Sequence, residues 1–157
     1  ELGAGGIMAA PGLLGLSIIR ELSSAPDFHL PIFLHPCFSG PLVLSADSGV
    51  SPFCYYGQFS RLAGADAAIF TSFGGRFPFT EEVCRKICDG TETEMGGLRS
   101  IFPVPSGGMK WQLFKKMVQV YGPDAIFLVG GALLTESDDL TANMHFYFEK
   151  LNEAVNK

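Results

Sequence analysis

Charged residues are scarce in this sequence. Asp, Glu, Lys and Arg make up 17% of its 157 residues, hydrophobic residues make up 47%, and the formal net charge is −5. A chain this apolar buries a core, so we expect a globular protein and not a disordered one. A nucleic-acid-binding surface needs a clustered positive stripe, and the negative net charge argues against one. Lys110, Lys115 and Lys116 form the one local basic group, which we interpret as a solvated helix face.

Long apolar runs are also absent. None reaches the roughly 20 residues that span a bilayer, and the longest candidate, Ile7 to Ile19, is interrupted by Pro11. No basic segment opens the chain, so we expect neither a signal peptide nor a membrane partner. The first residue is Glu1 and not methionine, which suggests a processed or truncated product.

The four cysteines lack the CxxC spacing of many metal and redox sites. We interpret them as small buried side chains in a reducing compartment, the cytoplasm or an organelle stroma or matrix. Ser-His-Asp spacing, a Walker loop and a GxGxxG fingerprint are likewise missing.

What the sequence does contain is a repeated unit, a short apolar run that ends in a glycine pair. The pairs are Gly74-Gly75, Gly107-Gly108 and Gly130-Gly131, and each is followed at short range by a helical pattern. Alternating strands and helices with short connections predict a parallel sheet of the α/β class. The predicted strands are Gly5–Ala9, Pro31–His35, Asp66–Thr71, Ile101–Pro105 and Ala125–Val129. The predicted helices are Leu13–Leu22, Pro52–Leu62, Thr80–Cys88, one ending at Tyr121, and a last one from Asp138, Asp139 or Thr141 to about Val155.

Five strands are too few for an eight-stranded barrel, which takes about 250 residues. The residues therefore leave two alternatives open. One is a small open α/β sheet. The other is the C-terminal part of a barrel whose remaining strands lie on residues outside this chain.

The last two glycine pairs predict an anion site. Gly107, Gly108, Gly130 and Gly131 would present backbone N–H groups to a phosphate, which glycine allows to approach closely. Ser106, directly before the first pair, would donate a hydrogen bond to a phosphate or hydroxyl group. Two consecutive loops of this kind match the phosphate site of (β/α)₈ barrels, built by the loops after strands 7 and 8. The alternative is that these glycines only form tight turns.

Four motifs in order carry a family resemblance. They are His35 at a strand end, Arg61–Asp66 before a strand, Phe102–Met109, and Tyr121–Gly131. In this order they resemble the fifth to eighth barrel strands of the large chain of ribulose bisphosphate carboxylase (RuBisCO). The resemblance extends from about Gly5 to Asp139. It implies that residues 1–157 form a single partial (β/α)₈ TIM-barrel domain, about strands 4–8, with parallel strands and with the N-terminal barrel strands absent.

Two departures point to the RuBisCO-like, type IV branch and away from CO₂ fixation. The family's mobile sixth loop holds a lysine in carboxylases, whereas Thr71–Phe79 holds Arg76 and no lysine. The resemblance implies that Arg76 clamps an anionic group when this loop closes. A second histidine expected four residues after His35 is Ser39. His35 itself is the candidate catalytic residue, binding a substrate hydroxyl or acting in proton transfer.

The resemblance also implies an activity. It is proton abstraction and enolisation of a phosphorylated sugar or keto-sugar acid, of the enolase, isomerase or decarboxylase type. The family's Mg²⁺ is held by a carbamylated lysine, an aspartate and a glutamate, which we expect outside this chain, so no residue here is assigned as a metal ligand. A half-barrel exposes apolar sheet, so we expect a homodimer or a complementary half-barrel. The alternatives are a non-catalytic scaffold or interaction subunit and a small phosphate- or nucleotide-binding module.

Overall fold

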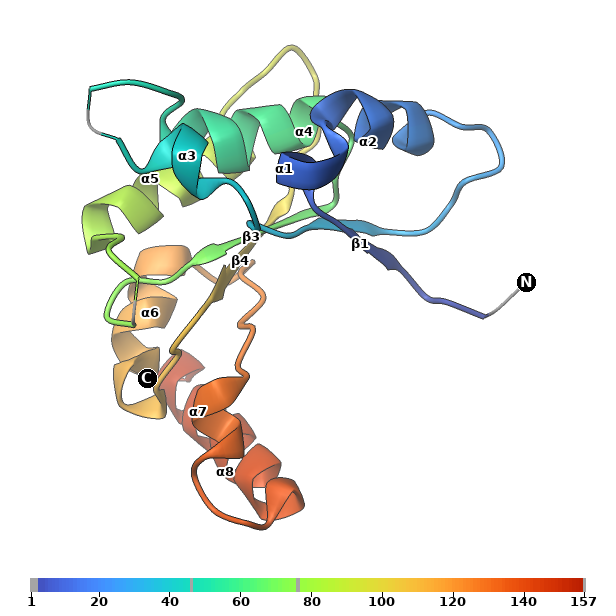
Figure 1. The fold of residues 1–157 in the computed structure, drawn as a ribbon. Helices are drawn as coiled ribbons and strands as arrows, with labels where there is room; N and C mark the ends of the chain where they lie inside the picture. Colours follow the sequence, from blue (N-terminus) through green and yellow to red (C-terminus); the bar gives the residue numbers. More distant parts are fainter. Residues whose placement is uncertain (1–2, 46, 76, 157) are drawn as a thin grey trace. The chain divides into compact units, whose positions relative to one another are not determined.

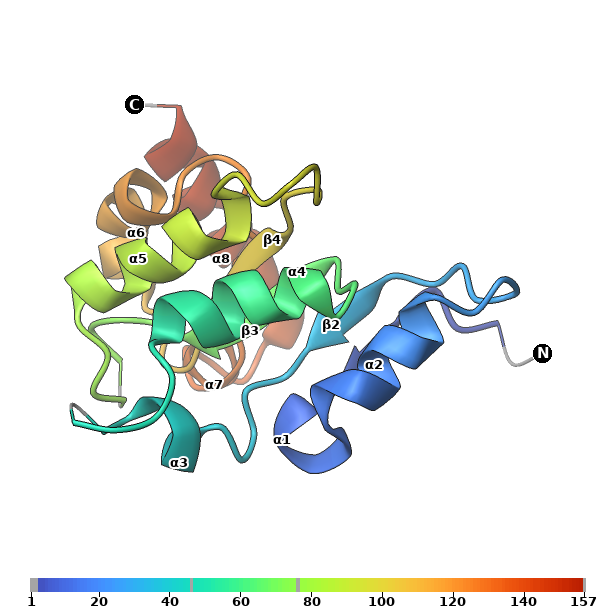
Figure 2. The same cartoon turned by 90° about the horizontal axis from the view of Figure 1, so that it is seen from above.

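The computed structural model describes residues 3–45, 47–75 and 77–156 (Figures 1 and 2). These residues group into two compact units. The first unit contains residues up to 70 together with 86–103, and the second contains 71–85 together with 104 onward. Each unit is described by itself below. No helix within the described residues has the length and apolarity that a bilayer crossing requires.

One parallel sheet confirms the predicted α/β class. Its strands, in spatial order, are β1 (Ile7–Ala9), β2 (Ile32–Leu34), β3 (Ala67–Thr71) and β4 (Phe102–Ser106). Met8 of β1 is in register with Phe33 of β2, and Phe33 is in register with Ala67 of β3. The carboxylate of Asp66 accepts the Ile32 N–H at 2.8 Å, while its carbonyl oxygen accepts the Phe102 N–H at 2.9 Å. Asp66 therefore fixes the starts of three neighbouring strands.

The first unit is covered by short helices. They are α1 (Pro11–Leu14), α2 (Leu16–Ser23), α3 (Gly40–Val43), the wide-turn π-helix η1 (Phe53–Phe59), α4 (Ser60–Leu62) and the second half of α5 (Glu81–Glu92). The prediction of one helix over Leu13–Leu22 is wrong, because Gly15 adopts φ +80° and separates α1 from α2. In Figures 1 and 2, α2 lies beside α4, and its Ile19 packs in a buried cluster with Ile32 and Leu34.

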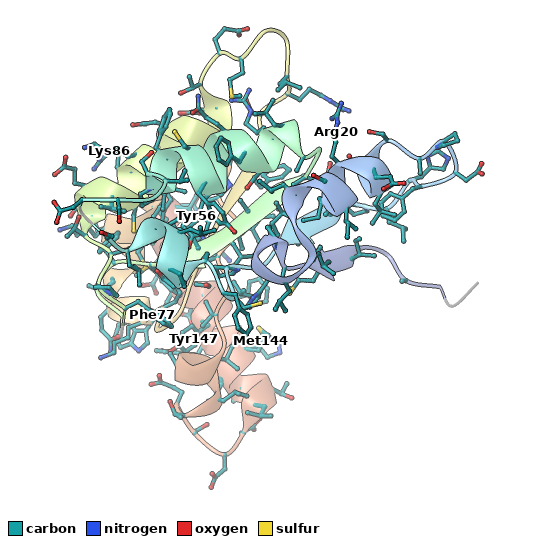
Figure 3. The ribbon with its side chains drawn as sticks, turned by 45° about the horizontal axis from the view of Figure 1, so that its top comes forward. Arg20, Tyr56, Phe77, Lys86, Met144 and Tyr147 are labelled. Carbon is teal, nitrogen blue, oxygen red and sulfur yellow. The ribbon has the colours of Figure 1, made fainter. Side chains whose placement is uncertain are left out.

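The second unit packs helices against one another around aromatic rings. They are η2 (Trp111–Leu113, a 3₁₀ turn), α6 (Phe114–Tyr121), α7 (Gly131–Leu134) and α8 (Leu140–Val155). The Phe114 ring centroid lies 5.7 Å from that of Phe127 and 5.8 Å from that of Tyr147. Tyr147 and Met144, labelled in Figure 3, both come from α8. The aromatic contacts therefore hold α8 onto α6.

Two predicted helix starts are confirmed by local hydrogen bonds. The Thr80 hydroxyl accepts the Val83 N–H at 3.3 Å at the start of α5, and Asp139 accepts the Ala142 N–H at 2.9 Å at the start of α8. These are the side-chain caps expected of threonine and aspartate. The predicted end of α5 at Cys88 is wrong, since the helix continues to Glu92.

The predicted fifth strand, Ala125–Val129, is reduced to one parallel bridge between Ser106 and Leu128. The cause lies in β4, where Pro103 and Pro105 are two residues apart, so that their backbone groups face the same edge of the strand. Proline has no N–H to donate, so this edge of β4 can only accept. The Pro105 carbonyl accepts the Leu128 N–H at 3.1 Å, whereas Pro103 and Pro105 have no N–H to return to the segment. The fold is thus four strands and an adjoining extended segment.

Candidate phosphate-binding site

A cavity of about 400 Å³ opens where β4 and the extended segment 125–129 end. It lies wholly within the second unit. Its lining residues are Ser106, Gly107, Gly108, Lys110, Leu128, Gly130, Gly131 and Ala132. The structure therefore brings together all five residues that the sequence predicts for a phosphate site.

The two glycine pairs shape this cavity differently. Gly107 and Gly108 have φ values of +82° and +93°, a left-handed conformation that other residues rarely adopt. Gly130 and Gly131 have negative or helical φ, and a methyl group on either would have no atom within 4 Å. The first pair is required by the turn, whereas the second pair leaves open space in front of the backbone.

The loop after β3 packs directly on the first glycine pair. A side chain at Gly75 would overlap the carbonyl oxygen of Gly107, and a methyl group on Gly107 would lie 2.9 Å from the ring of Phe77. Phe77 is labelled in Figure 3. This loop is the one in which the sequence predicts an anion clamp at Arg76. Arg76 itself lies outside the described residues, so its role stays a prediction.

A buried polar contact anchors the base of this loop. The hydroxyls of Ser72 and Tyr121 lie 2.7 Å apart, and the Cys84 thiol donates to the Thr71 carbonyl at 3.6 Å. Burial raises the pKa of both Tyr121 and Cys84, so both groups stay neutral at physiological pH. The loop thus starts from a rigid, uncharged anchor.

His35 follows β2 in the first unit, at the carboxyl end of that strand. Its backbone N–H donates to the Ala9 carbonyl at 2.8 Å, and its ring Nδ1 accepts the Cys37 N–H at 3.1 Å. Because Nδ1 is an acceptor, the neutral ring has its proton on Nε2. Nε2–H is therefore the hydrogen-bond donor of the neutral ring, and its role toward a substrate stays a prediction.

The tautomer of His35 is directly testable. In the complete protein, labelled with ¹⁵N-histidine, we expect the neutral His35 ring to be predominantly the Nε2–H tautomer. Two-bond ¹⁵N–¹H NMR correlation spectra distinguish the two tautomers. A predominantly Nδ1–H ring would contradict the geometry and would make Nε2 a proton acceptor instead.

Ser39, which stands where the resemblance expects a second histidine, has a structural role. Its side chain is 3% exposed, and its hydroxyl lies 2.7 Å from the Tyr56 hydroxyl and donates to the Pro36 carbonyl at 2.5 Å. Ser39 therefore holds the loop after β2 against η1.

Lys110 is the residue that sequence reasoning missed. Its interpretation as part of a solvated helix face is wrong, because Lys110 precedes η2 in extended conformation and lines the cavity. Lys116, by contrast, pairs with Glu81 on the surface at 2.5 Å and lowers the pKa of that carboxyl. The available signal was the position of Lys110, two residues after the Gly107-Gly108 pair.

No family model matches the chain. A 5-methylthioribulose-1-phosphate isomerase from Rhodospirillum rubrum is 37% identical over 138 residues, covering 85% of this chain and 34% of the relative. A 2,3-diketo-5-methylthiopentyl-1-phosphate enolase from Exiguobacterium sibiricum is 32% identical over 155 residues, covering 99% of this chain and 39% of the relative.

Among solved structures, a RuBisCO-like protein from Alicyclobacillus acidocaldarius superposes with a TM-score of 0.87 at 28% identity, covering 100% of this chain and 42% of that one. The chain matches the C-terminal part of a RuBisCO-like barrel. It thus spans little more than a third of the length of the two relatives named above. The RuBisCO-like resemblance predicted from the four motifs is confirmed, and so is the C-terminal, type IV placement.

Proposed function

We propose that this chain is the phosphate-binding part of a RuBisCO-like enzyme that enolises a phosphorylated sugar or keto-sugar and does not fix CO₂. The observation that carries the proposal is the single cavity that gathers Ser106 and both glycine pairs. The two relatives named above support it, since each is named for a phosphorylated compound and for an isomerase or enolase activity. The absence of lysine from Thr71–Phe79 supports the exclusion of carboxylation.

In this proposal the phosphate enters the open space before Gly130 and Gly131. Backbone N–H groups of the two glycine pairs donate to its oxygens, and the Ser106 hydroxyl adds a further donor. Such a grip positions the rest of the substrate, which is how binding energy at a non-reacting group assists a distant reaction. The role of His35 in hydrogen bonding or proton transfer stays a prediction from the sequence. Arg76 would add positive charge from the loop after β3.

The resemblance implies Mg²⁺, which stabilises the enediolate when bound. Within the described residues, no three His, Cys, Asp or Glu side chains are grouped so as to hold a metal ion. The described residues therefore do not fit a magnesium site of their own, and we derive no step through the ion. We propose that its ligands lie on the barrel strands outside this chain.

Exposed apolar side chains support a complementary half-barrel. In the first unit Met8 of the edge strand β1 is 60% exposed, and in the second unit Leu128 is 42% exposed. Phe127, between Ile126 and Leu128, packs against the helices, so its two neighbours face the other way. We propose that further barrel strands, from the same polypeptide or from a partner subunit, cover these residues.

The test is a deuterium-exchange assay on the complete protein as isolated from its source. The substrates are 5-methylthioribulose 1-phosphate and 2,3-diketo-5-methylthiopentyl 1-phosphate in D₂O. We expect the proton next to the carbonyl to exchange for deuterium, which ¹H NMR measures as a loss of its signal. Gly131→Val fills the open space without a steric clash in the fold, and we expect kcat/KM to fall about a hundredfold.

Gly5→Val is the matched control, because a side chain there also meets no atom within 4 Å and the residue lies in the other unit. Its activity should equal that of the unmodified protein. Absence of deuterium exchange with both compounds would contradict the enolase proposal and favour the non-catalytic scaffold. Full activity of Gly131→Val would show that this cavity does not hold the phosphate.

A further inference from the structure

Among the described residues that line the cavity, Lys110 alone has a charged side chain. A phosphate monoester has a charge of about −1.5 to −2 at that pH, whereas glycine N–H groups offer only partial positive charges. The backbone can therefore define the position of a phosphate, but among the described lining residues only Lys110 brings a full countercharge.

The backbone around Lys110 is fixed on both sides. Met109 is 1% exposed, and the Trp111 ring packs edge-on against Phe146 with centroids 5.4 Å apart. The Lys110 carbonyl accepts the Leu113 N–H at 3.0 Å, which closes the turn of η2. The lysine side chain is thus held at the cavity while its own atoms stay exposed to solvent.

Among the residues that the structure describes, no carboxylate forms an ion pair with Lys110, whereas Lys116 pairs with Glu81 and Lys150 pairs with Glu153 at 2.8 Å. A lysine ammonium is a compact point charge that binds phosphate without demanding a fixed geometry. The glycine N–H donors therefore define where the phosphate binds, and the mobile ammonium group of Lys110 neutralises its charge.

We propose that Lys110 is the residue that selects a doubly charged phosphate at this cavity. The inference rests on the proposed function, because it assigns a role within the same phosphate site. According to this proposal, the ligand group is a phosphate monoester and not a neutral or singly charged group of similar size. Binding then depends on ionic strength through Lys110, since an exposed charge is screened by salt.

The experiment measures binding of inorganic phosphate to the complete protein by isothermal titration calorimetry at pH 8, at low and at high NaCl. For Lys110→Met we expect about a tenfold weaker affinity at low salt and a smaller loss of affinity on adding salt. Lys110→Arg should restore most of the affinity, because it keeps the charge. Lys115→Met is the matched control, as Lys115 is exposed, close in sequence and absent from the cavity lining.

The outcomes separate the inference from the function on which it rests. If the unmodified protein does not bind phosphate, the proposed function fails. If it binds phosphate and Lys110→Met binds equally well, the Lys110 inference is overturned while the proposed function stands. An equal loss in Lys115→Met would also overturn it, because the effect would then come from general surface charge. A thermal unfolding midpoint shared by all variants confirms that folding is unchanged.

Discussion

Replacing Arg61 with leucine should lower the free energy of unfolding by about 3 kcal/mol. Arg61 is 3% exposed, and its guanidinium is surrounded by backbone carbonyls. Nε donates to the Arg99 carbonyl at 3.0 Å, Nη2 to the Leu98 carbonyl at 2.7 Å, and Nη1 to the carbonyls of Gly90 and Thr93.

These carbonyls belong to the C-terminal end of α5 and the connection to β4, where helix carbonyls lack partners within the helix. The positive guanidinium also offsets the partial negative charge of that helix end. Leucine would leave several buried acceptors without donors, which costs more than the loss of the bonds alone. The expected result is a large loss of stability from a residue with no role at the candidate site.

Urea denaturation of the complete protein, followed by circular dichroism, measures this effect. Arg61→Lys should recover only part of the stability, because an ammonium cannot reproduce the planar fork of donors. Arg20→Leu, at an exposed arginine on α2, serves as the control and should change stability by less than about 0.5 kcal/mol. A value for Arg61→Leu as small as that of the control would contradict the structural role assigned to Arg61.

The second large effect is expected at Gly90. The helices η1 and α5 cross with two glycines in contact, since a side chain at Gly57 would overlap the backbone of Gly90. A side chain at Gly90 would press on the carbonyl oxygen of Phe53 and lie 3.3 Å from the Cα of Gly57. Gly90→Val therefore forces the two backbones apart, and we expect a loss of about 3 kcal/mol.

The same denaturation experiment checks this prediction, with Gly96→Ala as a second glycine position. Gly96 has no atom within 4 Å of an added methyl group, although its φ of +56° makes alanine mildly strained. Its expected cost of about 1 kcal/mol is backbone strain alone. Equal losses at the two positions would show that the contact between η1 and α5 contributes nothing beyond conformational preference.

Features that depend on neighbours in sequence were predictable. Thr80 and Asp139 start helices because their side chains accept N–H groups three residues onward, and Gly122 ends α6 with φ +77°. The glycine pairs at strand ends were recognisable for the same reason. The two prolines of β4 were also visible, and their alternation was the missed signal that Ala125–Val129 cannot form a full ladder.

Features that depend on distant contacts were not predictable. The continuation of α5 past Cys88 relies on Gly57 and Arg61, which lie about thirty residues earlier in the chain. The His35 tautomer depends on the direction of the Cys37 N–H, and the positions of the histidines in the sequence do not reveal that direction. Lys110 was misread because three lysines at helical spacing suggest one face, whereas the helix begins only after Lys110.

The central claim is that the two last glycine pairs form one phosphate site, and ¹⁵N-glycine NMR tests it most directly. The complete protein, labelled with ¹⁵N-glycine, is titrated with inorganic phosphate, and the glycine amide signals are assigned by single substitutions. We expect the amide signals of Gly107, Gly108, Gly130 and Gly131 to shift together along one binding curve, while the signal of Gly5 does not shift. Shifts confined to other glycines, or no shift at saturating phosphate, would contradict it.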